Sequence, residues 1–108
     1  MIIVINRFLL RKGFRGIALW PFLIVREEKL KSDVVFLNHE KIHVRQQLEL
    51  LVVFFYLWYA IEFLVRWVGH KNRYLAYKNI CFEREAYLHE KDRNYLKQRS
   101  FWDFLKYV

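Results

Sequence analysis

Apolar and polar positions divide the chain into a short β-rich start and a longer helical remainder. Residues 1–6 and 16–28 are rich in β-branched and aromatic side chains, which predicts a strand in each. Because Pro21 cannot donate a backbone hydrogen bond, we expect the second strand to lie at the edge of a sheet. The pattern therefore predicts a mainly α fold with a short N-terminal β element, in the α+β class.

The remainder of the chain contains few signals that end a helix. Ser32 or Asp33 is suited to cap a helix that begins directly after them, and the next stop signal is the Gly-His-Lys-Asn sequence at 69–72. Residues 50–61 are apolar on every side, so we expect one long apolar helix through this region. A second helical segment is expected from residue 74 to residue 98.

The length of the apolar helix does not decide whether it lies in a protein core, in a bilayer or in a dimer interface. Residues 50–61 fall short of the about 20 apolar residues that span a bilayer, and a window of 48–68 would enclose Glu49, Glu62 and Arg66. We therefore expect a buried core helix. The alternatives are a helix that lies in or dips into the bilayer, and a homodimer interface.

Composition and charge point to one domain, residues 1–108, with an apolar surface to cover. The chain is 56% hydrophobic and 19% aromatic, which is oilier than a typical soluble domain. Its net charge is +8, with basic residues concentrated towards both ends, a pattern that suits anionic lipid or nucleic acid. Cys81 is the only cysteine, so no disulfide framework is expected, which fits a reducing compartment.

The sequence His39-Glu40-Lys41-Ile42-His43 is the strongest chemical signal. On a helix, residues four apart lie on one face, so the two imidazoles can bind one ion. Glu40 then lies beside the ion, where it can accept a proton from a metal-bound water, as in zinc hydrolases. The alternative is an amphipathic helix whose histidines are merely solvated.

A second motif, Phe-Glu-Arg-Glu-Ala-Tyr at 82–87, follows the apolar segment. Together the two motifs resemble the Glu-zincin core of the membrane zinc peptidases that include the CAAX prenyl proteases and the HtpX heat-shock peptidases. The resemblance implies a minimal zincin-like helix–strand core that binds Zn²⁺. It implies these roles: His39, His43 and Glu83 as zinc ligands, Glu40 as the base, and Ala86 as the small residue that lets two helices pack. The family's Asp, which orients a ligand, is Tyr87 in this chain.

Other third ligands remain open. Glu85 is the second candidate, and it points about 200° away from Glu83 on a helix, so both cannot face one ion. His70 and His89 are weaker candidates. If the first helix ran unbroken to Gly69, a straight return would leave Glu83 about 20 Å short of the histidines. We therefore expect the first helix to break, near residues 55–60. If it does not, the residue of the returning helix that lies level with His39 would be near Asp103.

These features predict a minimal zinc-dependent metallopeptidase that hydrolyses a peptide bond with a metal-activated water. Its substrate would be a peptide or protein held along the edge strand on either side of Pro21. We expect it at the cytoplasmic side of a membrane, with a cytoplasmic location as the alternative. The competing functions are a non-catalytic zinc-stabilised fold, a membrane-associated binding module and a basic nucleic-acid-binding module. The last is the least favoured, because no nucleic-acid motif is present.

Overall fold

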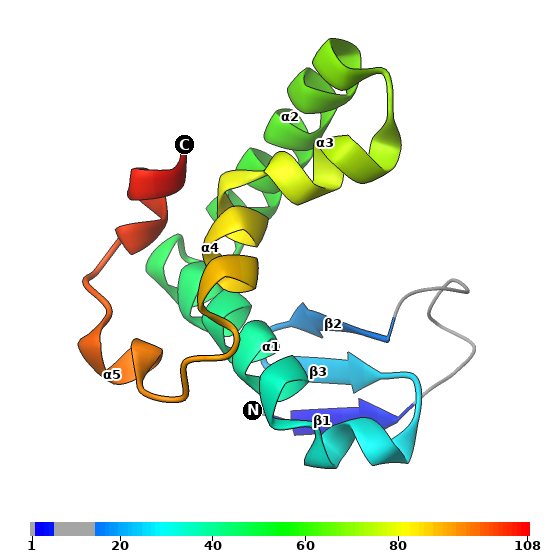
Figure 1. The fold of residues 1–108 in the computed structure, drawn as a ribbon, viewed down its shortest axis with the longest axis vertical. Coiled ribbons are helices and arrows are strands. Elements are labelled where there is room, and N and C mark those ends of the chain that lie inside the picture. Colours follow the sequence, from blue (N-terminus) through cyan, green and yellow to red (C-terminus); the bar gives the residue numbers. More distant parts are fainter. Residues whose placement is uncertain (1, 6–14) are drawn as a thin grey trace.

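The fold consists of a small sheet packed on one long helix, followed by a bent series of helices (Figure 1). It is seen in a computed structural model, which describes residues 2–5 and 15–108. The strands are β1 (Ile2–Ile5), β2 (Gly16–Leu19) and β3 (Phe22–Val25). The helices are α1 (Val34–Glu49), α2 (Val53–His70), α3 (Arg73–Asn79), α4 (Cys81–His89) and α5 (Tyr95–Gln98), with 3-10 turns at Glu28–Ser32 (η1) and Asp103–Tyr107 (η2). The α+β prediction is therefore confirmed.

The region predicted as one edge strand is a β-hairpin. Its strands β2 and β3 pair antiparallel, β1 pairs parallel with β3, and the sheet order is β1-β3-β2. Pro21 lies at the turn, where its missing N–H costs no sheet hydrogen bond and its carbonyl accepts from the backbone N–H of Ile2 at 2.7 Å. The edge strand beside α1 is thus β2, and β3 is the central strand.

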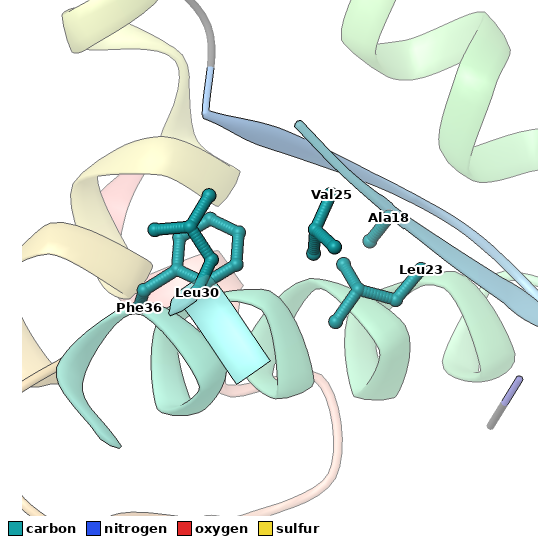
Figure 2. Packing of buried hydrophobic residues seen from close by; sticks show 5 residues of the cluster. All are labelled: Ala18, Leu23, Val25, Leu30 and Phe36. Atoms are coloured by element: carbon teal, nitrogen blue, oxygen red, sulfur yellow. The ribbon is translucent and has the colours of Figure 1, made fainter. Parts of the chain in front are cut away.

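One face of the sheet packs on α1 (Figure 2). Ala18, Leu23 and Val25 point from the strands towards the helix, where they meet Leu30 and Phe36. Of the two predicted N-caps, Ser32 and Asp33, it is Asp33 that caps α1, because its side chain accepts from the backbone N–H of Phe36 at 3.0 Å. This packing fixes the direction in which α1 leaves the sheet.

Gln47 ties the edge strand to the far end of the same helix. Its side-chain amide donates to the carbonyl of Ala18 at 2.7 Å and accepts from the backbone N–H of Trp20 at 2.8 Å. The residue is 1% exposed, and the two bonds give both the nitrogen and the oxygen of the buried amide a partner. The sheet and α1 therefore form one unit.

The predicted long apolar helix is two helices, α1 and α2, bent by 112°. The break lies at residues 50–52, earlier than the predicted 55–60, and Leu51 and Val52 take positive φ angles of 55° and 64°. Residues 55–60 stay helical because Phe55 packs tightly on the α4 residue Phe82, at 4.6 Å between ring centroids. No Gly or Pro lies at the bend, so tertiary packing sets its position.

No single helix within residues 2–5 and 15–108 is long and apolar enough to cross a membrane. Only α1 and α2 taken together, across their bend, reach that length and composition.

The predicted second helix, 74–98, is also divided into shorter helices. Ile80 has an extended conformation between α3 and α4, and residues 90–94 separate α4 from α5. This turn at Ile80 directs α4 back along α1 (Figure 1). Ala86 is fully buried beside Ile42, which agrees with its expected role as a small residue between packed helices.

The bend generates a stability prediction with opposite signs at two nearby leucines. Leu51 is 73% exposed at φ 55°, so Leu51→Gly should raise the free energy of unfolding by about 0.5–1 kcal/mol by removing backbone strain. The matched control Leu48→Gly, inside α1 and 45% exposed, should lower it by about 1 kcal/mol. Urea unfolding measures both, and equal destabilisation would contradict the bend.

Candidate metal centre

Helices α1 and α4 bring together the three residues that the two motifs single out. The Nε2 atoms of His39 and His43 lie 3.1 Å apart. Oε1 of Glu83 lies 3.0 Å from Nε2 of His43 and 3.3 Å from Nε2 of His39. All three residues are buried, with exposed fractions of 4–7%. The bend after α1 makes this possible, because it lets the chain return Glu83 to the level of the histidines.

The outward-facing atoms of the three side chains are also bound. Nδ1 of His39 contacts Oε2 of Glu90 at 2.8 Å, and Nδ1 of His43 contacts Oε1 of Gln46 at 2.8 Å. The second oxygen of Glu83 accepts from the hydroxyl of Tyr59, on α2, at 2.7 Å. Each side chain is therefore held in orientation by a partner outside the cluster.

These partners determine which nitrogen of each histidine carries a proton. The amide nitrogen of Gln46 donates to Oε1 of Glu85 at 2.8 Å and to the carbonyl of Phe82 at 3.1 Å. Since both are acceptors, its oxygen must face His43, whose Nδ1 is then the donor. The carboxylate of Glu90 can only accept a hydrogen bond, so Nδ1 of His39 is also a donor. Both Nε2 atoms therefore turn their lone pairs towards the centre of the cluster.

The cluster thus directs two imidazole lone pairs and one carboxylate oxygen at a single point, an arrangement that requires a cation. Burial alone would lower the pKa of His43, but the adjacent Glu83 carboxylate outweighs it and raises this pKa to about 9. Burial would raise the pKa of Glu83, but His43 and His39 hold it well below its usual range. A proton can fill the position of the cation, and the three donor atoms could equally hold a metal ion.

Glu40 lies next to this group on α1 and is 7% exposed. Burial raises its pKa, and the charges of His43 and His39 oppose that rise. It is therefore a buried carboxylate within electrostatic reach of all three clustered residues, separate from the donor set itself. Such a group can exchange a proton with a molecule bound at the centre.

Tyr87, at the position where the resemblance would place an Asp, takes a packing role. Its ring lies edge-on against the ring of His39, 4.5 Å between centroids, and its hydroxyl is bonded to that of Tyr77 at 2.7 Å. The carboxylate that orients His39 comes instead from Glu90, about one turn further along the same face. Glu83, Tyr87 and Glu90 recur at helical spacing, so this periodicity was a usable signal for Glu90.

Glu85, the second candidate ligand, lies outside the centre. It is fully buried and bonded to Arg99, which also contacts Glu49 at 2.6 Å. The opposite directions of Glu83 and Glu85 agree with their predicted rotation about the helix axis. No comparable sequence signal marks Tyr59 or Gln46, because their contacts depend on the bend and on the approach of α4.

The remaining candidates are placed elsewhere. Asp103 bonds to Tyr95 at 2.9 Å, in the C-terminal segment. His89 stacks on Tyr95, with ring centroids 3.8 Å apart, and contacts the hydroxyl of Tyr107 at 2.6 Å. His70 is exposed at the end of α2. None of these three belongs to the His39, His43 and Glu83 cluster.

Comparisons with known proteins add no family to this geometry: no family model, curated protein or solved structure matches the chain.

Metal content tests the assignment of Glu83 over Glu85. Protein purified without chelator should contain one divalent ion per chain by mass spectrometry, and Glu83→Gln should lose it because the one carboxylate among the three donors is replaced by a neutral amide. The matched variant Glu85→Gln should retain the ion, since Glu85 faces Arg99. Loss of metal in Glu85→Gln with retention in Glu83→Gln would contradict this centre.

Glu90 provides a second prediction. Glu90→Gln should weaken metal binding by about 10–100-fold, because a neutral amide replaces the carboxylate that accepts the hydrogen bond from Nδ1 of His39. Competition with a fluorescent chelator measures the affinity. Glu27→Gln is the control and should bind as the wild type does, because Glu27 is an exposed carboxylate at the start of η1 that pairs with Lys29.

Proposed function

We propose that this protein is a zinc-dependent peptide hydrolase with a Glu-zincin-like centre. The observation that carries the proposal is the buried donor set of His39, His43 and Glu83 with Glu40 beside it. Two imidazoles, one carboxylate and one remaining position are the ligand set of zinc hydrolases. The α+β fold, with an edge strand packed on the motif helix, is compatible with a minimal zincin-like core.

Zinc is favoured over other divalent ions by ligand type and by size. Calcium and magnesium prefer oxygen ligands, whereas two imidazoles favour zinc and related metals. A tetrahedral zinc ion with bonds of about 2.0–2.1 Å requires donor atoms about 3.3 Å apart. The three separations in this cluster are 3.0, 3.1 and 3.3 Å, so side-chain shifts of a few tenths of an ångström would complete the geometry.

Glu40 would act as the proton carrier. Bound zinc lowers the pKa of a water ligand towards about 7. Glu40 would accept the proton from that water and pass it to the leaving amine of the peptide. Because burial raises its pKa, Glu40 holds the transferred proton more readily than an exposed carboxylate would.

The edge strand β2 offers backbone groups that could align an extended substrate. Along an antiparallel strand, every second residue directs its backbone N–H and C=O away from the neighbouring strand. Ala18 is bonded outwards to Gln47, so Gly16, two residues earlier, also directs its backbone groups away from β3. Gln47 already takes the carbonyl of Ala18 and the N–H of Trp20. A substrate strand would therefore pair with residues 15–18, on one side of Pro21 only.

A zinc-stabilised fold without catalysis is the second candidate. It is favoured by the deep burial of the three donor residues, which leaves limited access for a peptide. Both candidates bind zinc. They differ in whether a water bound to the zinc hydrolyses a peptide.

Glu40→Gln separates the two candidates. If the protein is a hydrolase, this variant should retain its zinc and lose activity on a mixed peptide library by about 10²–10⁴-fold, because the proton carrier is gone. Peptide cleavage is followed by mass spectrometry, and Glu27→Gln serves as the control with unchanged activity. Wild-type protein that holds one zinc and cleaves no peptide would leave the non-catalytic fold as the function.

A further inference from the structure

Helix α2 packs inwards through aromatic side chains and its few polar groups, and it turns an aliphatic side outwards. On the inner side, Tyr59 donates to Glu83, and Glu62 accepts from the backbone N–H of Cys81 at 3.0 Å and from Arg66. The outer side is aliphatic and exposed, and we call it the outer face of α2. It consists of Leu57 (54% exposed), Ile61 (62%), Leu64 (55%), Val65 (64%) and Val68 (80%).

Helical spacing makes this outer face continuous. Leu57, Ile61, Leu64 and Val68 follow the i, i+4, i+7, i+11 pattern of a single stripe, on the side of the helix opposite Tyr59 and Glu62. A helix on the surface of a water-soluble domain normally presents polar and charged residues to the solvent. A continuous exposed aliphatic stripe is stabilised only when something apolar covers it.

The charges around the outer face indicate what covers it. Lys71 and Arg73, at the end of α2 and the start of α3, are exposed there, and residues 63–79 contain no acidic residue. Exposed aromatic rings lie in the same segment, with Trp67 40% exposed and Tyr74 66% exposed. Aliphatic residues bordered by basic and aromatic side chains are typical of a surface that rests on anionic lipid headgroups.

A second copy of this chain fits the same surface less well. The net charge of each copy is +8, and many of its carboxylates are not available to neutralise a basic neighbour. Five acidic residues are buried: Glu40, Glu49, Glu83, Glu85 and Asp103. The side chains of Glu62 and Glu90 are only 10% and 21% exposed. Lipid phosphates supply the missing negative charge.

We propose that the outer face of α2 binds an anionic lipid bilayer, lying at the boundary of headgroups and acyl chains with Lys71 and Arg73 at the phosphates. In this proposal α2 lies on the membrane, in agreement with the finding that no single described helix is long and apolar enough to cross one. The metal centre is on the opposite side of the same helix, about one helix diameter of 10 Å from the lipid. The proposal does not depend on the identity of the metal or on catalysis.

Vesicle sedimentation with the purified full chain tests the apolar contact. Wild-type protein should bind vesicles of equal parts phosphatidylglycerol and phosphatidylcholine. The variant Ile61→Asp/Val68→Asp should bind at least tenfold more weakly, because it places two charges in the acyl boundary. Leu88→Asp, on α4 and 66% exposed, is the matched control and should bind as the wild type does. Equal weakening by Leu88→Asp, or no binding by the wild type, would overturn the proposal.

The charge contribution is tested separately, with a variant that leaves the apolar face intact. Lys71→Gln/Arg73→Gln should reduce binding to the anionic vesicles by about tenfold or more, and wild-type binding to pure phosphatidylcholine should be weaker by a similar factor. Sedimentation equilibrium tests the competing occupant. A dimer that Ile61→Asp/Val68→Asp dissociates, without vesicle binding by the wild type, would assign the outer face to a second copy and overturn the lipid proposal.

Discussion

Glu83 of α4 lies against His39 and His43 of α1, and this contact holds the two halves of the helical chain together. It joins two helices that are separated by the whole of α2 and α3, and it buries three groups whose lone pairs repel one another unless a cation lies between them. The helical path between them serves this contact: the chain bends by 112° after α1 and turns again at Ile80, so that α4 returns beside α1. Local backbone strain at Leu51 and Val52 is the cost of that return.

A buried polar network supports the same contact from the other side of α1. His43 is bonded to Gln46, Gln46 to Glu85, and Glu85 to Arg99, which also holds Glu49. Burial would lower the pKa of Arg99, but Glu85 and Glu49 outweigh it and keep the guanidinium charged. A buried ion pair contributes little net stability, yet removal of one member is strongly unfavourable, so the network specifies one arrangement of α1, α4 and the C-terminal segment. The orientation of the Gln46 amide, and with it the tautomer of His43, follows from that arrangement.

Helix α2 connects the centre with the proposed membrane surface. Its inner side contributes Tyr59 to the centre and Glu62 to the start of α4, while its outer side presents aliphatic residues. The composition of the chain, 56% hydrophobic, is explained in part by this arrangement, since α2 is apolar where it is exposed. If both proposals hold, peptide hydrolysis would take place next to a lipid surface, which would favour substrates that are themselves held there.

The sequence by itself determined the features that depend on neighbouring residues. Asp33 starts α1, the two histidines share a face because they are four apart, and Glu83 and Glu85 point in opposite directions because helix geometry rotates them. The two histidines of the donor set and the α+β class follow from such features, whereas the choice of Glu83 over Glu85 came from the resemblance. The turn at Pro21 and the contacts of Gln46, Tyr59 and Glu90 were not predicted. The position of the bend was predicted several residues too late. Each of these depends on which distant segment packs against which, and no Gly or Pro marks the bend. Local preferences are all that a short stretch of sequence encodes, whereas these features depend on the packing of distant segments, as in the contact of Phe55 with Phe82.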